Sequence, residues 1–487
     1  MNIISQNFRN VLKNRLESKI NYLTSTFVDN LMNSLTGKDN VYLTLASEAN
    51  RVSKDIAKEV IIEVIEEFDA YFRDSKERKR TYYVSKKDVP RTITTILGDL
   101  TFTRTLYVTK DRNEYYFYID EMLGLPKYDH YDPIVKGLAI RETFYTNQAQ
   151  AGRIVGERIT DIANLADKNT APFAISRQTI YSWLSKWNTT IVYERHKSTP
   201  RTLYIMADEK YIGAQGKDGD IMAKAFVVFE GVKQVSKGRR ALINRHVFTC
   251  RSSKPWEELL DRLIKIYDYD EIEDFYVLSD GGNWLTVGMH ELKLESFQKV
   301  EHLLCLFHFK QAIHHITTVE EERKAIFQSF LNDKRKVFKY VLNTYIDKYP
   351  HRKVTIEKKI KYVLNHYKAA KHMVSSAIGS SMEAHISHFI ASIFASRPKG
   401  YKESNINKYF MLNDAKINGI NLFNTYLLTY NRTEKNSQCD ESACNTPLLK
   451  KREELPIISL PYLNGSNSLP TYHALSDLSR MDREIKV

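Results

Sequence analysis

The sequence has little cysteine, no long apolar run and no sign of a secretory leader. Its four cysteines, Cys250, Cys305, Cys439 and Cys444, are scattered over 487 residues. They are too few for a disulfide scaffold, and a reducing interior fits them best. No apolar stretch approaches the roughly 20 residues that span a bilayer, and the first residues lack the apolar segment of a signal peptide. We therefore expect a cytoplasmic protein with no membrane partner.

Positive charge, by contrast, is in excess. The chain carries 72 lysines and arginines against 59 acidic residues, which gives a formal net charge of +13. Such a balance favours a polyanionic partner. Because nothing in the chain favours a membrane, nucleic acid is the expected partner rather than an anionic lipid surface. With 43% hydrophobic residues the chain can build a large core, and its length allows about three domains.

The N-terminal part is predicted to change from helices to a small sheet. Apolar residues at helical spacing predict helices up to about residue 75, which would form a bundle or a dimerisation arm. The basic run at residues 76–80 is typical of a solvated face, with a DNA-binding arm as the alternative. From Arg91 the period becomes two, with a hairpin turn expected at Gly98-Asp99 and a third strand over Glu114–Ile119.

Residues 126–190 are predicted to be helical again. Ser176 is a suitable N-cap for a helix with the apolar stripe Ile180, Trp183 and Leu184. An upstream helix near residues 148–162 would be its partner, so the pair resembles a helix-turn-helix whose second helix reads base edges. The alternative is an amphipathic helix packed on the next domain. The polar residues expected to contact DNA are Arg177, Gln178, Thr179, Tyr181 and Lys186.

Two apolar strands in the central region each lead into an aspartate. Leu203–Ala207 precedes Asp208, and Phe275–Leu278 precedes Ser279 and Asp280, which two glycines follow. Acids at the ends of buried strands are carried to the edge of a sheet, where they can hold a cation. We expect these two strands to be neighbours that present a carboxylate pair. Glu209 should point off the opposite face of its strand.

The elements around these strands follow the order three strands, helix, strand, helix, strand. That is the order of an RNase H-like fold, although the pattern by itself gives only a mixed α/β domain. The remaining elements are predicted as strands over 223–229, 242–249 and 299–306, a basic loop between the first two of these, a helix begun by Ser253 and Pro255, and a helix over 284–292.

A strongly basic helical segment follows, and then a third candidate acid. Residues 309–375 contain 15 basic and 6 acidic residues, a net charge of +9. This excess favours phosphate contact over an ordinary solvated face, and its densest part includes Lys334, Arg335, Lys336 and Lys339. Glu383 lies near the start of the next predicted helix, and Arg397 and Lys399 lie near its end, where we expect them to contact DNA.

Asp208, Asp280 and Glu383 would suit phosphodiester chemistry with two hard cations about 3.5 to 4 Å apart. Oxygen ligands of this kind suit two Mg²⁺ ions, or Mn²⁺ in their place. Cys305 and His308, in the sequence CLFH, are the other candidates. They could be half of a zinc site, but no second pair has matching spacing. We expect instead that Cys305 is a buried strand residue and that His308 lies near the scissile phosphate.

Several of these motifs resemble those of DDE transposases of bacterial insertion sequences, specifically the Lre-two group, which is related to the Mutator-like superfamily. ADEKYI resembles the first-aspartate strand, VLSDGGNWL the second, and GSSMEAHISHFIASIFASRPKGY the glutamate helix. CLFH resembles the C-x-x-H motif of Mutator-like transposases, and the basic block at 309–375 resembles their all-helical insertion. ISRQT and LPYLNG also fit the group.

The resemblance implies a multidomain α+β protein with an RNase H-like catalytic core. It implies binding to terminal inverted repeats and target DNA, a homo-oligomer, and association with the bacterial nucleoid. A nuclease without strand transfer and a non-catalytic DNA-binding regulator remain alternatives. The expected regions are 1–85 (helical), 86–125 (small β region), 126–195 (helix-turn-helix), 196–308 (first part of the core), 309–375 (helical insertion), 376–410 (glutamate helix) and 411–487 (partly irregular).

Overall fold

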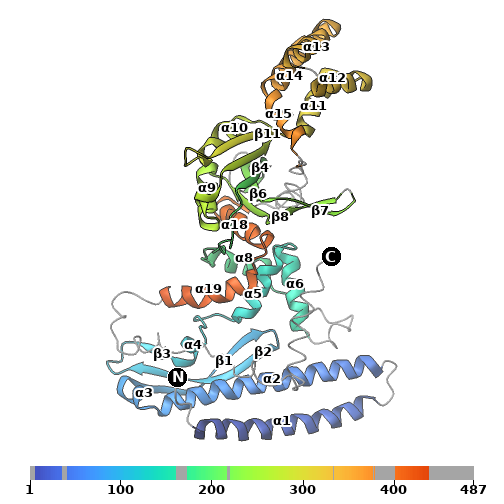
Figure 1. Ribbon diagram of the computed structural model, residues 1–487. Coiled ribbons are helices and arrows are strands. Elements are labelled where there is room, and N and C mark those ends of the chain that lie inside the picture. Colours follow the sequence, from blue (N-terminus) through green and yellow to red (C-terminus); the bar gives the residue numbers. More distant parts are fainter. Residues whose placement is uncertain are drawn as a thin grey trace. The chain divides into compact units, whose positions relative to one another are not determined.

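The computed structural model of the chain describes residues 6–35, 41–160, 173–215, 220–237, 239–332, 334–376, 378 and 401–437 (Figure 1). The chain divides into two units. The first comprises Met1–Asp132, Ile159–Ala171 and Tyr430–Val487, and the second comprises Pro133–Arg158 and Pro172–Thr429. Within the described ranges, every helix is too short or too polar to cross a membrane.

The first unit is a helical hairpin with a three-stranded antiparallel sheet. Its elements are α1 (Gln6–Leu35), α2 (Val41–Asp74), α3 (Lys76–Thr81), β1 (Tyr82–Thr95), β2 (Gly98–Thr109), β3 (Tyr115–Phe117) and α4 (Tyr118–Met122). The apolar face of α2 packs on the sheet, because Ile65 joins Leu100 and Phe102 in one core. The predicted helices and the hairpin are thus confirmed.

Two details of that hairpin differ from the sequence prediction. The turn is formed by Ile96 and Leu97, and Gly98 with φ 101° is already the first residue of β2. The Thr95 hydroxyl closes this turn by donating to the Gly98 carbonyl at 2.9 Å. The third strand ends at Phe117, because the next residues form α4 and bury Ile119 completely.

The second unit is built around a five-stranded mixed sheet with the order β11-β10-β4-β6-β9. β10 is parallel to both β4 and β11, while β6 is antiparallel to β4 and β9 is antiparallel to β6. The strands are β4 (Thr202–Ile212), β6 (Ile221–Phe229), β9 (His246–Cys250), β10 (Asp274–Ser279) and β11 (Lys299–Leu304). The predicted succession of strands and helices is therefore observed, in a mixed α/β arrangement.

One face of this sheet is covered by α9 (Pro255–Ile266), and α10 (Asn283–Gly288) follows β10. The odd-numbered residues Leu203, Ile205 and Ala207 of β4 point to this face and share a core with Trp256 and Leu263 of α9. Successive side chains of a strand point to opposite faces of the sheet, which produces this division. The even-numbered residues, Asp208 among them, belong to the other face.

Several predicted boundaries in this region were wrong. β4 does not end at Asp208, because antiparallel pairing with β6 continues as far as Ile212. The basic loop is itself a hairpin of β7 (Gly231–Ser236) and β8 (Arg239–Ile243), and β9 is a separate strand after it. The N-cap of α9 is Lys254 rather than Ser253. β11 ends at Leu304, so Cys305 already caps the next helix.

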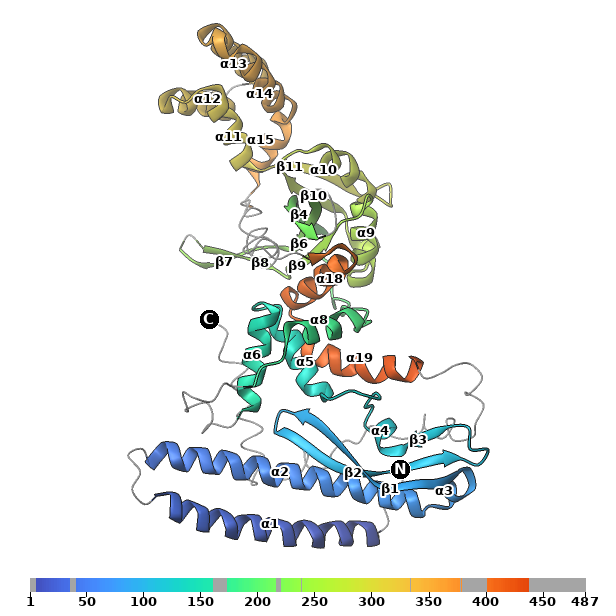
Figure 2. The same cartoon turned by 180° about the vertical axis from the view of Figure 1, so that it is seen from behind.

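Helices α11–α15 form a second core beyond β11 (Figure 1). They are α11 (Leu306–Ile316), α12 (Glu320–Asn332), α13 (Arg335–Lys348), α14 (Lys353–Asn365) and α15 (Tyr367–Ser375). Phe309, Phe330 and Phe338 are fully buried among them. α15 packs on β11, which connects the helical group to the sheet. Figure 2 gives the reverse view of these elements.

Helix α18 (Ile406–Ile417) covers the edge strand β9, and α19 (Leu422–Ser437) follows it. Asp414 accepts hydrogen bonds from the backbone N–H of Thr249 at 2.6 Å and from its hydroxyl at 2.9 Å. One turn later Asn418 accepts from the Val247 N–H at 2.7 Å and donates to the Val247 carbonyl at 2.8 Å. An exposed strand edge invites pairing with other chains, and these two side chains satisfy it.

Candidate active site

Asp208 on β4 and Asp280, directly after the end of β10, follow equivalent positions of two neighbouring parallel strands. The last partner pair between β4 and β10 is Met206 with Leu278. Two residues further on, the same register brings Asp208 level with Asp280, and the alternation of a strand puts both on one face. Asp208 remains paired with Ala225 of β6, whereas Asp280 follows directly after the last residue of β10.

The two carboxyl groups interact electrostatically. The pKa of Asp208 is raised to about 6, mainly by burial and further by the negative charge of Asp280, although the Glu209 N–H, which donates to Asp208 at 2.8 Å, lowers it. Placing two carboxylates close together in a partly buried site disfavours their joint ionisation. A divalent cation would relieve this repulsion, and carboxylate oxygens are the ligands that Mg²⁺ prefers.

The loop that carries Asp280 is tightly held by its own residues. The Asp280 carboxylate accepts a hydrogen bond from the Gly282 N–H at 2.9 Å. Gly281 has φ 88°, and a Cβ atom there would lie 2.5 Å from the ring of His366. Only glycine fits both the left-handed backbone and this close approach, which accounts for the first of the two glycines after Asp280.

A hydrogen-bonded aromatic cluster from α14 and β11 supports this loop. The Tyr362 hydroxyl donates to the Asp280 backbone carbonyl at 2.6 Å, and its ring contacts His366 with centroids 4.8 Å apart. The His302 ring is 5.7 Å from that of His366, and its Nε2 lies 2.9 Å from the Ser279 hydroxyl. Burial lowers the pKa of His302 to about 4 and also lowers the pKa of His366, so both rings are neutral near pH 7.

The CLFH motif connects the helical group to the same loop. The Cys305 N–H donates to the Ser279 carbonyl at 2.9 Å, which ties the start of α11 to the residue before Asp280. The pKa of His308 is raised, first by a hydrogen bond with Cys305 and then by the charges of Asp280 and Asp208. Cys305 is buried, as expected, but it caps α11 and is not a strand residue as predicted. The two aspartates therefore favour the protonated form of His308.

Glu209 lies on the opposite face of β4 from the acid pair. Its carboxylate accepts a hydrogen bond from the indole N–H of Trp284 at the start of α10. Lys224, its cross-strand partner on β6, lies 5.3 Å from the centre of the same indole ring. Glu209 therefore has a structural partner of its own and serves as a control for Asp208.

The third predicted acid, Glu383, and the predicted DNA contacts Arg397 and Lys399 lie outside the described residues. Among the residues that the structure does describe, no group of three or more His, Cys, Asp or Glu side chains is arranged to hold a metal ion. Asp208 and Asp280 supply a donor pair, which fits a cation that keeps several water ligands.

Helix α8 (Arg177–Lys186) begins as predicted, with the Ser176 hydroxyl accepting the Thr179 N–H at 3.1 Å. Arg177, Gln178 and Lys186 are exposed. The hydroxyl of Thr179 is 2.8 Å from that of Ser176, and the hydroxyl of Tyr181 accepts a hydrogen bond from Asn405 at 3.1 Å. Thr179 and Tyr181 are therefore partly engaged inside the protein.

A close backbone contact positions α8 against α6 (Gln148–Ile159). A Cβ atom at Gly152 would lie 2.0 Å from the Ile175 carbonyl oxygen, and one at Gly156 would lie 1.8 Å from that of Phe173. The two glycines are one turn apart, so they form a groove on α6 that accepts the segment leading into α8. The sequence prediction did not include this contact, although its signal was present as two glycines at helical spacing.

The basic residues predicted in the helical segment are mostly exposed. Lys334, Lys336 and Lys339 lie at and just after the start of α13 with exposed side chains. Arg335 differs from them, because it donates to the Leu364 carbonyl at the end of α14 at 3.1 Å. Its side chain therefore joins two helices in addition to contributing charge.

Comparison with known proteins gives this chain a family. The model of an uncharacterised protein family (UPF0236) matches residues 39–427. UPF0236 protein TTE2489 of Caldanaerobacter subterraneus subsp. tengcongensis is 26% identical over 404 residues, covering 80% of this chain and 81% of the relative. UPF0236 protein TTE0610/TTE0881/TTE1053/TTE2432 of the same organism is 25% identical over 402 residues, covering 80% of each chain. A third UPF0236 protein of the same organism, whose name joins eleven TTE designations, is 24% identical over 406 residues, again covering 80% of each chain.

Proposed function

This chain belongs to the uncharacterised protein family UPF0236, and we propose that it is a DNA transposase of an insertion sequence, with a catalytic core of the RNase H-like type. The observation that carries the proposal is the parallel register of β4 and β10, whose last partner pair, Met206 with Leu278, comes two residues before Asp208 and Asp280. The strand order β11-β10-β4-β6-β9 supports an RNase H-like core, because the acid-bearing strands are central neighbours in it.

The acid pair would hold two Mg²⁺ or Mn²⁺ ions together with Glu383. When bound, such ions activate the attacking oxygen and stabilise the leaving 3′ oxygen of a phosphodiester. The chain's own residues orient the site. Gly282 and Tyr362 hold the Asp280 loop, and His308 presents a proton or a positive charge next to the reacting phosphate.

DNA would be held by two separate basic surfaces. The lysines at the start of α13 offer phosphate contacts that do not depend on sequence. Arg177 and Gln178, exposed at the N-terminus of α8, offer the side chains that read guanine and adenine in the major groove. α6 and α8 would thus form the helix-turn-helix that recognises terminal inverted repeats. We infer self-association as well, since Tyr22 and Met32 of α1 expose 70% and 65% of their surface.

The names of the relatives add independent support. Two of them join four and eleven locus designations from one organism. Joined designations are expected of a sequence that occurs at several places in one genome, and multiplication within a genome is expected of a mobile element. A housekeeping regulator or an ordinary nuclease would not require such repetition. A bacterial cytoplasmic location at the nucleoid follows from the same proposal.

The test is 3′-end nicking of a duplex that carries the element's terminal repeat, in Mg²⁺, beside a gel shift for binding. Asp208→Asn and Asp280→Asn keep shape but remove the charge that holds the cations, so each should abolish nicking and strand transfer while binding persists. Glu209→Gln keeps an acceptor for Trp284 and should retain substantial activity. Full nicking by either aspartate variant would refute the proposal.

The two alternatives are separated by the products. A nuclease would nick the repeat but would not join its 3′-OH to target DNA. A regulator would bind the repeat and leave it intact in any divalent metal. The same assay with a labelled target plasmid therefore distinguishes all three functions. Glu383→Gln belongs in the series, because its loss of activity would complete the acid set.

A further inference from the structure

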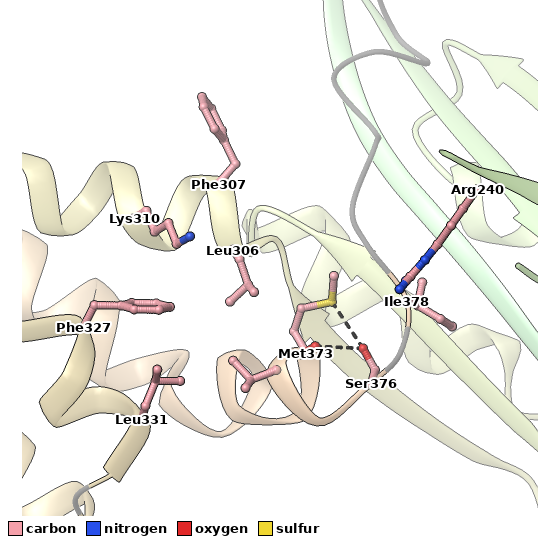
Figure 3. A pocket seen from close by; sticks show the side chains of 10 residues that line it. Arg240, Leu306, Phe307, Lys310, Phe327, Leu331, Met373, Ser376 and Ile378 are labelled. Atoms are coloured by element: carbon pink, nitrogen blue, oxygen red, sulfur yellow. Dashed lines mark hydrogen bonds between the residues drawn. The ribbon is translucent and has the colours of Figure 1, made fainter. Parts of the chain in front are cut away.

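A hollow of about 510 Å³ lies among α11, α12 and α15, and neither Asp208 nor Asp280 lines it (Figure 3). Its volume falls in the range of about 300 to 1,000 Å³ that is usual for small-molecule sites. The start of α11 carries His308, which interacts electrostatically with both aspartates, and Cys305, whose backbone N–H donates to the Ser279 carbonyl, and the same turn contributes Leu306 to the hollow. An α-helix with its side chains is only about 10–12 Å across, so the hollow and the acid pair are close neighbours.

One wall of the hollow is formed by apolar side chains and includes a flat ring. Leu306, Phe327 and Leu331 converge on it from α11 and α12, with Met373 of α15 opposite them (Figure 3). Met373 is nearly buried, and its sulfur accepts a hydrogen bond from Ser376 at 3.7 Å, which fixes that side of the wall. An aromatic ring within such a wall suits a planar group such as a nucleobase.

The rim of the hollow is positive. The Lys310 ammonium lies 4.9 Å from the centre of the Phe327 ring, and the exposed Arg240 reaches the rim from β8 (Figure 3). None of the described residues that line the hollow is acidic. Together with the +9 net charge of residues 309–375, this rim favours a polyanionic occupant over an apolar peptide or a second copy of the chain.

We propose that this hollow binds one unpaired nucleobase of the DNA strand that passes the acid pair, with Phe327 as the stacking surface and Lys310 and Arg240 on the adjacent phosphates. The proposal rests on the proposed function, because it takes DNA as the substrate. Enzymes that act on a nucleotide within a duplex often extrude a base into such a pocket. Here the extruded base would anchor the strand beside the scissile phosphate.

The experiment uses the full chain and a short oligothymidylate that contains one 2-aminopurine, whose fluorescence changes when it stacks. Phe327→Leu keeps apolar packing and removes the π-face. It should weaken binding of the single strand about fivefold to a hundredfold and abolish the fluorescence change, while affinity for a repeat-free duplex stays unchanged. Tyr340→Leu, at an exposed aromatic residue on α13 away from the hollow, is the matched control and should change neither reading.

Lys310→Gln, at an exposed position, repeats the test without altering the core and should lower single-strand affinity in the same direction. Circular dichroism melting verifies that each variant is folded. Wild-type affinity of both variants for the single strand would overturn the proposal, and so would an equal loss on single strand and duplex. If the sedimentation coefficient of the variants differs from that of the wild type while their single-strand binding is unchanged, a protein rather than a nucleobase occupies the hollow. That result would also overturn the proposal. If wild-type protein nicks the repeat while these readings fail, only the base-binding hollow is refuted, whereas full nicking by Asp280→Asn refutes the transposase itself.

Discussion

The hydroxyl of Tyr362 donates a 2.6 Å hydrogen bond to the backbone carbonyl of Asp280. Tyr362 belongs to α14, in the helical group that begins after β11, and Asp280 belongs to the sheet edge 82 residues earlier. Burial raises the pKa of Tyr362 and the nearby Asp280 charge raises it further, so the hydroxyl stays protonated and remains a donor. The helical group thus fixes the backbone that carries a proposed catalytic acid.

Tyr362→Phe should slow nicking while duplex binding is retained. The change removes one hydroxyl, and the ring still packs on His366. Losing a hydrogen bond of this kind costs only about 0.5–1.5 kcal/mol in stability, but small displacements of a catalytic group can lower rates up to about a hundredfold. We expect a loss of roughly tenfold to a hundredfold in single-turnover nicking. Tyr340→Phe, at an exposed position of α13, is the control. A wild-type nicking rate for Tyr362→Phe would contradict the positioning role of Tyr362.

Charge reversal at Lys336 and Lys339 should weaken DNA binding on every sequence. The ammonium groups of these exposed lysines can bind phosphates, so each substitution should reduce the slope of log K against log salt by about one. Fluorescence anisotropy over a salt series measures both effects. Arg335 should be left intact, because it supports the end of α14. Lys324→Gln, whose ammonium is 2.7 Å from Glu320, serves as the control. An unchanged salt slope would remove α13 from the DNA surface.

Changes at the start of α8 should affect discrimination between sequences. Arg177→Ala and Gln178→Ala each remove one exposed side chain that could contact a base edge. Each should reduce the binding free energy for the repeat, relative to random DNA, by roughly 1–3 kcal/mol. Competition binding between the two DNAs gives that difference directly. Tyr181→Phe should leave discrimination intact, since the Tyr181 hydroxyl is engaged by Asn405. Equal losses on both DNAs would mean that α8 is not a recognition helix.

The stability of the chain should decrease as the pH rises from about 4 to 7. Complete burial raises the pKa of Asp414 to about 7, whereas the unfolded carboxyl has a pKa of about 3.9. The folded state therefore binds the proton more tightly. The contribution of this proton to the free energy of unfolding is fully present below the pKa of the unfolded carboxyl. It is lost as the pH rises to the pKa of Asp414 in the folded state. At roughly 1.4 kcal/mol per unit of pKa difference, the change is a few kcal/mol.

Asp414→Asn should remove this dependence. Its amide oxygen can accept the Thr249 N–H, and its NH₂ can donate to the Thr249 hydroxyl, so both hydrogen bonds to β9 survive in altered polarity. Urea unfolding at pH 5 and pH 8 compares the two proteins. An equal pH dependence in both would show that another group is responsible.

The sequence by itself determined which segments form the acid-bearing strands of the central sheet and which two aspartates follow their apolar runs. The short apolar runs Leu203–Ala207 and Phe275–Leu278 predict buried strands, because such a run is a feature of the local sequence. The same local rules gave the N-cap at Ser176 and the helices α1 and α2. They could not fix where β4 ends, because the continuation to Ile212 depends on pairing with β6, which is a separate strand.

Only the tertiary structure decided what surrounds the acids. Tyr362, His366 and His302 lie against the Asp280 loop through contacts between residues far apart in sequence, and no local pattern marks them. The same holds for Asp414, which lies in a region predicted to be partly irregular although it satisfies the edge of β9. Hydrogen bonds between distant elements depend on how those elements pack. Residue types and short-range spacing therefore predicted the candidate acids, while the packing of α14 and α18 determined how they and their sheet are held.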